Sequence, residues 1–334
     1  MSRRVTLRVV QAVISVGLLG YLVTIVPMRD VAAALAEARY GWMLCGLAAV
    51  LAAQLTGALQ MRSILALQGV HFSLWQVFGI NVISIFYGLV LPSSLSGGAV
   101  RWYHFSKPEG KHAQALAAMI FSRGVEIVTM LGFGVVFWFA AKTEGSSGPI
   151  IATLAVALAA MVSIVLLLVS DAQHALVNAA MARFSRARRL RNGIRSVSAC
   201  LAEFGHHGWG RQLRFLAVCI IRNAFAVSAF LSFARAIGVG APAADLGWVR
   251  SATDLLLILP ISVAGVGVRE ASLVALLAPL DVAPSLALAF AFVLLGVTIL
   301  ISIAGGLVEA LRIFLGVAPG LRGRTGESPR AAGR

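Results

Sequence analysis

Long apolar segments constrain this chain more than any other feature of its sequence. Six segments are each long enough, at about 20 mostly apolar residues, for a helix to cross the hydrocarbon core of a bilayer. Because 59% of the residues are hydrophobic and only 12% are charged, one soluble core cannot bury the apolar surface. We therefore predict an all-α integral membrane protein whose first segment is a retained helix. The segments are Val9–Pro27, Trp42–Gln60, Ala113–Ala141, Pro149–Ser170, Leu213–Ala236 and Ser285–Phe314.

Two further apolar stretches, Trp75–Arg101 and Ala243–Leu280, are interrupted in the middle by Pro and Gly. Arginines cluster at the N-terminus, in the 181–195 loop and in the C-terminal tail, which the positive-inside rule assigns to the cytoplasm. The full spans already return the chain to that side. Each broken stretch must then enter and leave on one side, as a re-entrant hairpin. We predict one transmembrane domain over residues 1–315 and a flexible cytoplasmic tail over 316–334.

The two breaks belong to an internal repeat. Residues 91–101 read LPSSLSGGAVR and residues 259–269 read LPISVAGVGVR, with six identities in eleven positions that include Pro, Gly and Arg. The flanking spans follow the same offset of 168 residues, which gives repeats over about 5–141 and 149–315. The count of crossings gives the halves opposite orientation. Inverted repeats with broken helices at mid-membrane are typical of transporters.

The formal net charge of +15 raises the question of nucleic-acid binding. The arginines lie between and beside apolar spans, where contact with anionic lipid explains them better, so we expect no nucleic-acid partner. Cys45, Cys200 and Cys219 stand alone, without CxxC or Cys/His ligand spacing. We expect no metal site and no cofactor.

Charged residues inside apolar spans need a reason, since burial there costs about 2.5–3.5 kcal/mol on insertion scales. An arginine fork suits a phosphate, glycines allow close approach of the backbone, and Arg123 and Glu126 are spaced to pair on one helix face. The alternative is that these residues form structural salt bridges and kinks, as the isolated Arg222 also could. The candidate lipid-binding residues are Pro92, Gly97, Gly98, Arg101, Arg123, Glu126, Asp254, Pro260, Gly265, Gly267, Arg269 and Glu270.

The motifs LP…SGGAVR, FSRGVEIVTM and LPISVAGVGVRE make the chain resemble the lysylphosphatidylglycerol synthase transmembrane region. This family of flippase-like membrane proteins includes the flippase half of the multiple peptide resistance factor, and the resemblance covers roughly residues 5–315. Ser93, Ser94 and Ser96 depart from it, at positions that are often Gly-rich in the family. The resemblance implies movement of a phospholipid or isoprenoid-type lipid between leaflets. It does not imply lysyl transfer, which belongs to a separate soluble domain of the full-length synthases.

We therefore expect a lipid translocase of a bacterial inner membrane, with both termini cytoplasmic, rather than an enzyme. No Walker A pattern occurs, so we expect downhill or ion-coupled movement, with Glu126, Asp254 and Glu270 as candidate proton carriers. Two alternatives stay open. One is an accessory protein that holds a lipid-modifying enzyme in a lipid, hopanoid or glycolipid pathway. The other is an intramembrane lipid-phosphate hydrolase, for which the recruitable residues are Ser93, Ser94, Ser96, Arg101 and His104.

The predicted topology is testable with reporter fusions. Fusions after Gly145 and Gly240 should report the outside, and fusions after Arg195 and Arg324 the cytoplasm, because only the latter two follow arginine-rich segments. An external reporter after Arg195 would contradict the crossing count.

Overall fold

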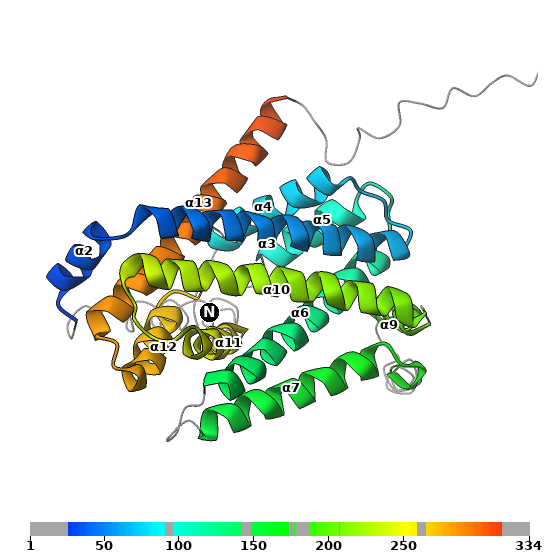
Figure 1. Cartoon of the computed structure of the whole chain (residues 1–334). Helices are drawn as coiled ribbons and strands as arrows, with labels where there is room; N and C mark the ends of the chain where they lie inside the picture. The colour runs from blue at the N-terminus through cyan, green and yellow to red at the C-terminus, as the bar shows by residue number, and fades with distance from the viewer. Residues whose placement is uncertain are drawn as a thin grey trace, which may run out of the picture.

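The computed structural model describes residues 26–90, 96–141, 148–173, 175, 177, 188–206, 208–258 and 265–315, and every regular element in these ranges is helical (Figure 1). The helices are α2 (Met28–Ala36), α3 (Tyr40–Leu67), α4 (Leu74–Val90), α5 (Ser96–Ser106), α6 (His112–Ala141), α7 (Gly148–Leu168), α9 (Arg188–Gly205), α10 (Trp209–Ile237), α11 (Ala243–Ile258), α12 (Val268–Leu277), the 3₁₀ turn η1 (Ala278–Leu280) and α13 (Pro284–Phe314).

Five of the described helices, α3, α6, α7, α10 and α13, are long and apolar enough to cross a membrane. They correspond to five of the six predicted spans, and nearly all of the sixth, Val9–Pro27, lies outside the described residues. Helix α7 shows why lipid must surround them, since it buries one side chain, Leu154, and exposes Val156 and Leu166 by 69% and 62%. The prediction of an all-α membrane protein is confirmed.

The first broken stretch forms α4 and α5, which pack against each other, and its Pro92 lies outside the described residues. The two ends of this hairpin meet. Lys111 Nζ donates to the carbonyl of Gly69 at 2.7 Å, and the N–H of His71 donates to Glu109 Oε1 at 3.2 Å. The chain therefore enters and leaves on one side, as a re-entrant hairpin does.

This closure is tied to a carboxylate. Hydrogen bonding from Lys111 lowers the pKa of Glu109 from its usual value. The contact is therefore complete above the ordinary carboxyl pKa and is lost only as the pH falls through the lowered value.

The second broken stretch forms α11 and α12, and its Pro260 also lies outside the described residues. Gly265 and Gly267 precede α12 at φ +79° and +85°, in the left-handed region that glycine adopts without strain. The entrance and exit of this hairpin pack into one core, because Val239 and Val282 are buried in the same apolar cluster. Both halves of the chain thus contain a helix–break–helix hairpin that returns to its starting side.

The packing of the helices repeats between the halves. At the offset of 168 residues α3 is equivalent to α10, α4 to α11, α5 to α12 and α6 to α13. Helix α4 packs on α13 just as α11 packs on α6, and α2 packs on α13 as α9 packs on α6. Each of these contacts therefore has an equivalent contact in which the two halves are interchanged, and this indicates pseudo-two-fold symmetry.

Helices α3 and α10 lie side by side and run antiparallel (Figure 1). The N–H of Arg39, before α3, donates to the carbonyl of Ala236 near the end of α10 at 2.9 Å, and Gly57 faces Arg222. Because two equivalent helices run in opposite directions, the halves are inverted. Arg222 is equivalent to Gln54, less than one helical turn from Gly57, so the pseudo-two-fold axis passes beside Arg222.

Close packing of α13 on α4 gives a stability test. A Cβ at Gly305 would collide with the backbone carbonyl of Val82, whereas a Cβ at Gly296 in the same helix would meet nothing within 4 Å. We expect Gly305→Ala to destabilise the protein by about 1–3 kcal/mol through overpacking, measured as thermal unfolding in detergent. Gly296→Ala, which gains only helix propensity, should leave stability unchanged or raise it by up to about 1 kcal/mol. Equal unfolding temperatures for the two variants would contradict this packing.

Candidate functional site

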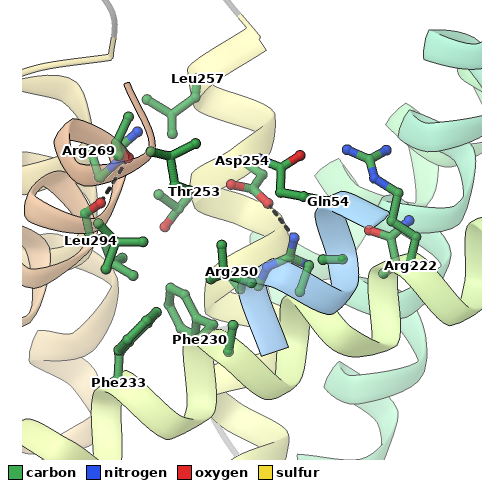
Figure 2. A pocket seen from close by; sticks show the side chains of 18 of the residues that line it. Gln54, Arg222, Phe230, Phe233, Arg250, Thr253, Asp254, Leu257, Arg269 and Leu294 are labelled. Atoms are coloured by element: carbon green, nitrogen blue, oxygen red, sulfur yellow. Dashed lines mark hydrogen bonds and ion pairs between the residues drawn. The ribbon is translucent and has the colours of Figure 1, made fainter. Parts of the chain in front are cut away.

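A cavity of about 290 Å³ lies between the two halves (Figure 2). It is lined by residues of α3, α6, α10, α11, α12 and α13, so spans of both halves and the second hairpin build its wall. Its lining is unusually charged for a chain that is 12% charged overall. The polar side chains that matter below are Glu126, Arg222, Asn223, Arg250, Asp254 and Arg269.

Glu126 joins three helices electrostatically. Its Oε1 lies 2.8 Å from Arg222 Nη2 of α10, and its Oε2 lies 3.3 Å from Arg123 Nη1 of its own helix. Arg101 of α5 acts electrostatically on the same carboxylate, and its Nε is buried without a hydrogen-bond partner among the described residues. Two guanidinium groups therefore contact one carboxylate, and the charge of a third acts on it.

The i,i+3 spacing predicted the pair of Arg123 and Glu126, and the structure has it. The shorter ion pair, to Arg222, was not predicted. A lone arginine in the middle of an apolar span was the signal for it, but the spacing along the chain could not show which carboxylate it meets.

The second charged group lies on α11. Arg250 Nη2 lies 3.2 Å from Asp254 Oδ2, one turn along the same helix, and Figure 2 shows this pair at the cavity wall. Arg250 Nη1 is buried without a hydrogen-bond partner among the described residues. Asp254 is the more accessible of the two, with 34% of its side chain exposed against 13% for Arg250.

The repeat-equivalent arginines reach this region from the two hairpins. Arg269 of α12 lines the cavity directly, in the first turn of its helix. Arg101 of α5 reaches it through Glu126 and Arg222, whose charges act on it. Of the predicted residues, Glu126, Asp254 and Arg269 line the cavity. Arg123 pairs with Glu126, and Arg101 acts on Glu126 only through its charge.

The remaining described candidates shape the hairpins. Gly97 lies so close to the Ser84 carbonyl of α4 that a Cβ would be 2.6 Å from it, so this glycine allows α4 and α5 to touch. Gly98 has open space around its Cβ position. Glu270 is fully buried, and its Oε2 accepts a hydrogen bond from the Gly267 N–H at 2.6 Å, which fixes the turn before α12.

A polar contact inside the bundle was also missed. Asn223 Nδ2 donates to Thr129 Oγ1 at 2.8 Å, and Thr129 Oγ1 lies 3.2 Å from Cys219 Sγ. This trio joins α6 to α10 next to the Glu126–Arg222 pair and supports its geometry. Among the described residues no group of three or more His, Cys, Asp and Glu side chains could hold a metal ion.

A comparison with protein families gives one match. The family model described as the lysylphosphatidylglycerol synthase TM region matches residues 8–306, which include both hairpins and all the residues of the cavity. Comparisons with curated proteins and with solved structures find no match.

The Arg222–Glu126 pair should be energetically coupled. In a double-mutant cycle of Arg222→Gln and Glu126→Gln, we expect a coupling of about 0.5–3 kcal/mol in denaturant unfolding in detergent, because the pair joins two helices in a partly dehydrated site. The exposed pair of Lys111 and Glu109 is the control, and its coupling should stay below about 1 kcal/mol. Additive effects of the two Gln substitutions would contradict the ion pair.

Proposed function

Because the chain belongs to the lysylphosphatidylglycerol synthase transmembrane family and is a multi-pass membrane protein with a lipid-related role, we propose that it is a lipid translocase. Its cargo is a phosphate-bearing or isoprenoid-type lipid that moves between the leaflets of a bacterial inner membrane. The observation that supports this most is the excess of arginine at and beside the cavity. Arg222, Arg250 and Arg269 line it together with two carboxylates, Glu126 and Asp254. Arg123 pairs with Glu126, and the charge of Arg101 acts on Glu126 as well.

An excess of positive charge at this depth favours an anionic ligand. Uncompensated charge is costly in a bilayer, and a bound anion removes part of that cost. Guanidinium groups bind phosphate oxygens through parallel hydrogen bonds, which makes arginine better suited than lysine to hold a head group. Arg222 and Arg250 each already form an ion pair with a carboxylate through Nη2. Arg269 lines the cavity without an ion pair among the described residues.

The inverted repeat supplies a path between leaflets. Arg101 and Arg269 are equivalent positions on hairpins of opposite orientation, so one approaches the cavity from each side of the pseudo-two-fold axis. A head group that leaves one arginine can be received by the other while its hydrocarbon chains stay in lipid. Alternating access around a mid-membrane site is the usual mode of inverted-repeat transporters.

The proposed orientation has both termini in the cytoplasm, and α9 supports it. This helix carries Arg191 and Arg195, which are both partly buried, and it buries Leu201 and Phe204. Phe204 stacks on Phe121 of α6 with ring centroids 4.4 Å apart. A basic amphipathic helix fixed to the bundle in this way suits the anionic cytoplasmic leaflet. Anionic lipids are therefore the proposed partners.

Translocation is measured with the purified protein in liposomes of phosphatidylethanolamine and phosphatidylglycerol. Fluorescent head-group variants of the inner leaflet become accessible to an impermeant quencher when they are flipped. We expect the wild-type protein to accelerate this loss of protection, and Arg101→Gln or Arg269→Gln to slow it at least about tenfold, which corresponds to about 1.4 kcal/mol of lost interaction. Arg211→Gln, on the exposed start of α10, is the matched control and should flip at the wild-type rate.

Two results would reject the proposal. One is a folded wild-type protein that accelerates no lipid. The other is a set of arginine variants as fast as wild type. Release of inorganic phosphate from a polyprenyl pyrophosphate in the same liposomes would instead support a hydrolase.

A further inference from the structure

Glu126 is placed differently from Asp254, the other carboxylate that lines the described cavity. Its two oxygens contact guanidinium groups of two helices, Arg222 of α10 at 2.8 Å and Arg123 of α6 at 3.3 Å. The third arginine that acts on it, Arg101, comes from the first hairpin. By contrast Asp254 pairs at 3.2 Å with Arg250 of its own helix, so that pair is closed within α11.

The repeat shows that helix packing does not require this carboxylate. At the offset of 168 residues the position equivalent to Glu126 is Leu294 of α13, which also lines the cavity. Arg222 is likewise equivalent to the neutral Gln54, another lining residue. The repeat therefore has uncharged side chains at both equivalent positions, Leu294 in the second half and Gln54 in the first, and the charge of Glu126 needs a reason other than packing.

A carboxylate held between several arginines imitates the contacts of a phosphate. Both are anions whose oxygens accept charge-assisted hydrogen bonds from guanidinium forks. A phosphate has more oxygens than a carboxylate, and Arg101 Nε is an unused buried donor among the described residues. The arginines around Glu126 can thus hold a phosphate once the carboxylate has moved aside.

We propose that Glu126 is a resident counter-anion, which occupies the place of the lipid phosphate in the empty protein and competes with that phosphate for Arg101, Arg123 and Arg222. This inference rests on the proposed function and deepens it. Without a competitor, three arginines in a low-dielectric site would hold the head group too tightly for it to leave. Transport needs binding that is favourable enough for entry and weak enough for exit, as in conduction through a channel. Glu126 lowers the affinity and speeds release.

The sign of one affinity change tests this role. Dioctanoyl phosphatidylglycerol is titrated calorimetrically into the full chain in detergent, for wild type and for Glu126→Gln. Gln keeps the size of the side chain and an oxygen acceptor for Arg222, but removes the competing charge. We expect Glu126→Gln to bind the lipid about tenfold more tightly, and in liposomes to flip it several-fold more slowly. A merely structural carboxylate predicts the opposite affinity change, because its loss would disorder the arginines.

Asp254→Asn is the matched control, since it removes a carboxylate from the same cavity without releasing Arg222. Its effect on affinity should be clearly smaller than that of Glu126→Gln. Equal effects would overturn the inference. They would mean that the affinity depends on the total charge of the cavity and not on displacement of the Glu126 carboxylate from its arginines. Weaker binding to Glu126→Gln than to wild type would overturn it as well.

A parallel titration with inorganic phosphate identifies the ligand. Removal of the competing charge should tighten the binding of both ligands, and a site that serves a lipid head group should bind the lipid more tightly than free phosphate. Tightening for free phosphate alone would overturn the assignment to a lipid. If the wild-type protein binds no phosphate-bearing lipid and flips none, the proposed function fails. If the wild type binds and flips lipid while the Gln variant binds it no more tightly, only the role of Glu126 fails.

Discussion

The antiparallel contact of α3 with α10 places the central ion pair of the cavity, Arg222–Glu126. These two helices are equivalent in the repeat, so their contact spans the pseudo-two-fold axis, and Gly57 allows Arg222 to lie against α3 at that point. With Arg222 held beside the axis, its guanidinium group reaches Glu126 of α6 at 2.8 Å. Around this pair, α4 of the first half packs on α13 of the second, and α11 of the second half packs on α6 of the first. The position of the cavity is therefore a product of the symmetry.

Symmetry of the backbone does not extend to the charges. Helix α11 carries the Arg250–Asp254 pair, whereas the equivalent positions of α4 are Val82 and Phe86, which pack against α13 instead. Conversely, α6 carries Glu126 where α13 has Leu294. Each half thus contributes one carboxylate group to the centre, on a span in one half and on a hairpin in the other. An asymmetric charge pattern on a symmetric scaffold gives the two halves of the bundle different electrostatic environments.

Much of this fold could be predicted from the sequence because lipid imposes simple rules. Backbone polar groups must be satisfied within the protein, so about 20 apolar residues indicate a spanning helix and a Pro/Gly interruption indicates a hairpin. The Arg123–Glu126 pair followed from local spacing on one helix. The Arg222–Glu126 pair did not, since it depends on how α10 packs against α6. Gly97 and Glu270 were candidates for ligand contact, and the structure places them in helix contact and turn capping, which depend on tertiary packing too.

The ends of the two hairpins are held to different degrees. Apolar packing joins both, around Val70 and Ala115 in the first and around Val239 and Val282 in the second. The first also has the hydrogen bonds from Lys111 to Gly69 and from His71 to Glu109. Hydrogen bonds are directional and short-ranged, while apolar packing tolerates small sliding of one surface over another. The hydrogen bonds therefore fix the relative orientation of the two ends of the first hairpin. The packing that joins the ends of the second restrains orientation less, so two equivalent hairpins are attached to this symmetric bundle with unequal stiffness.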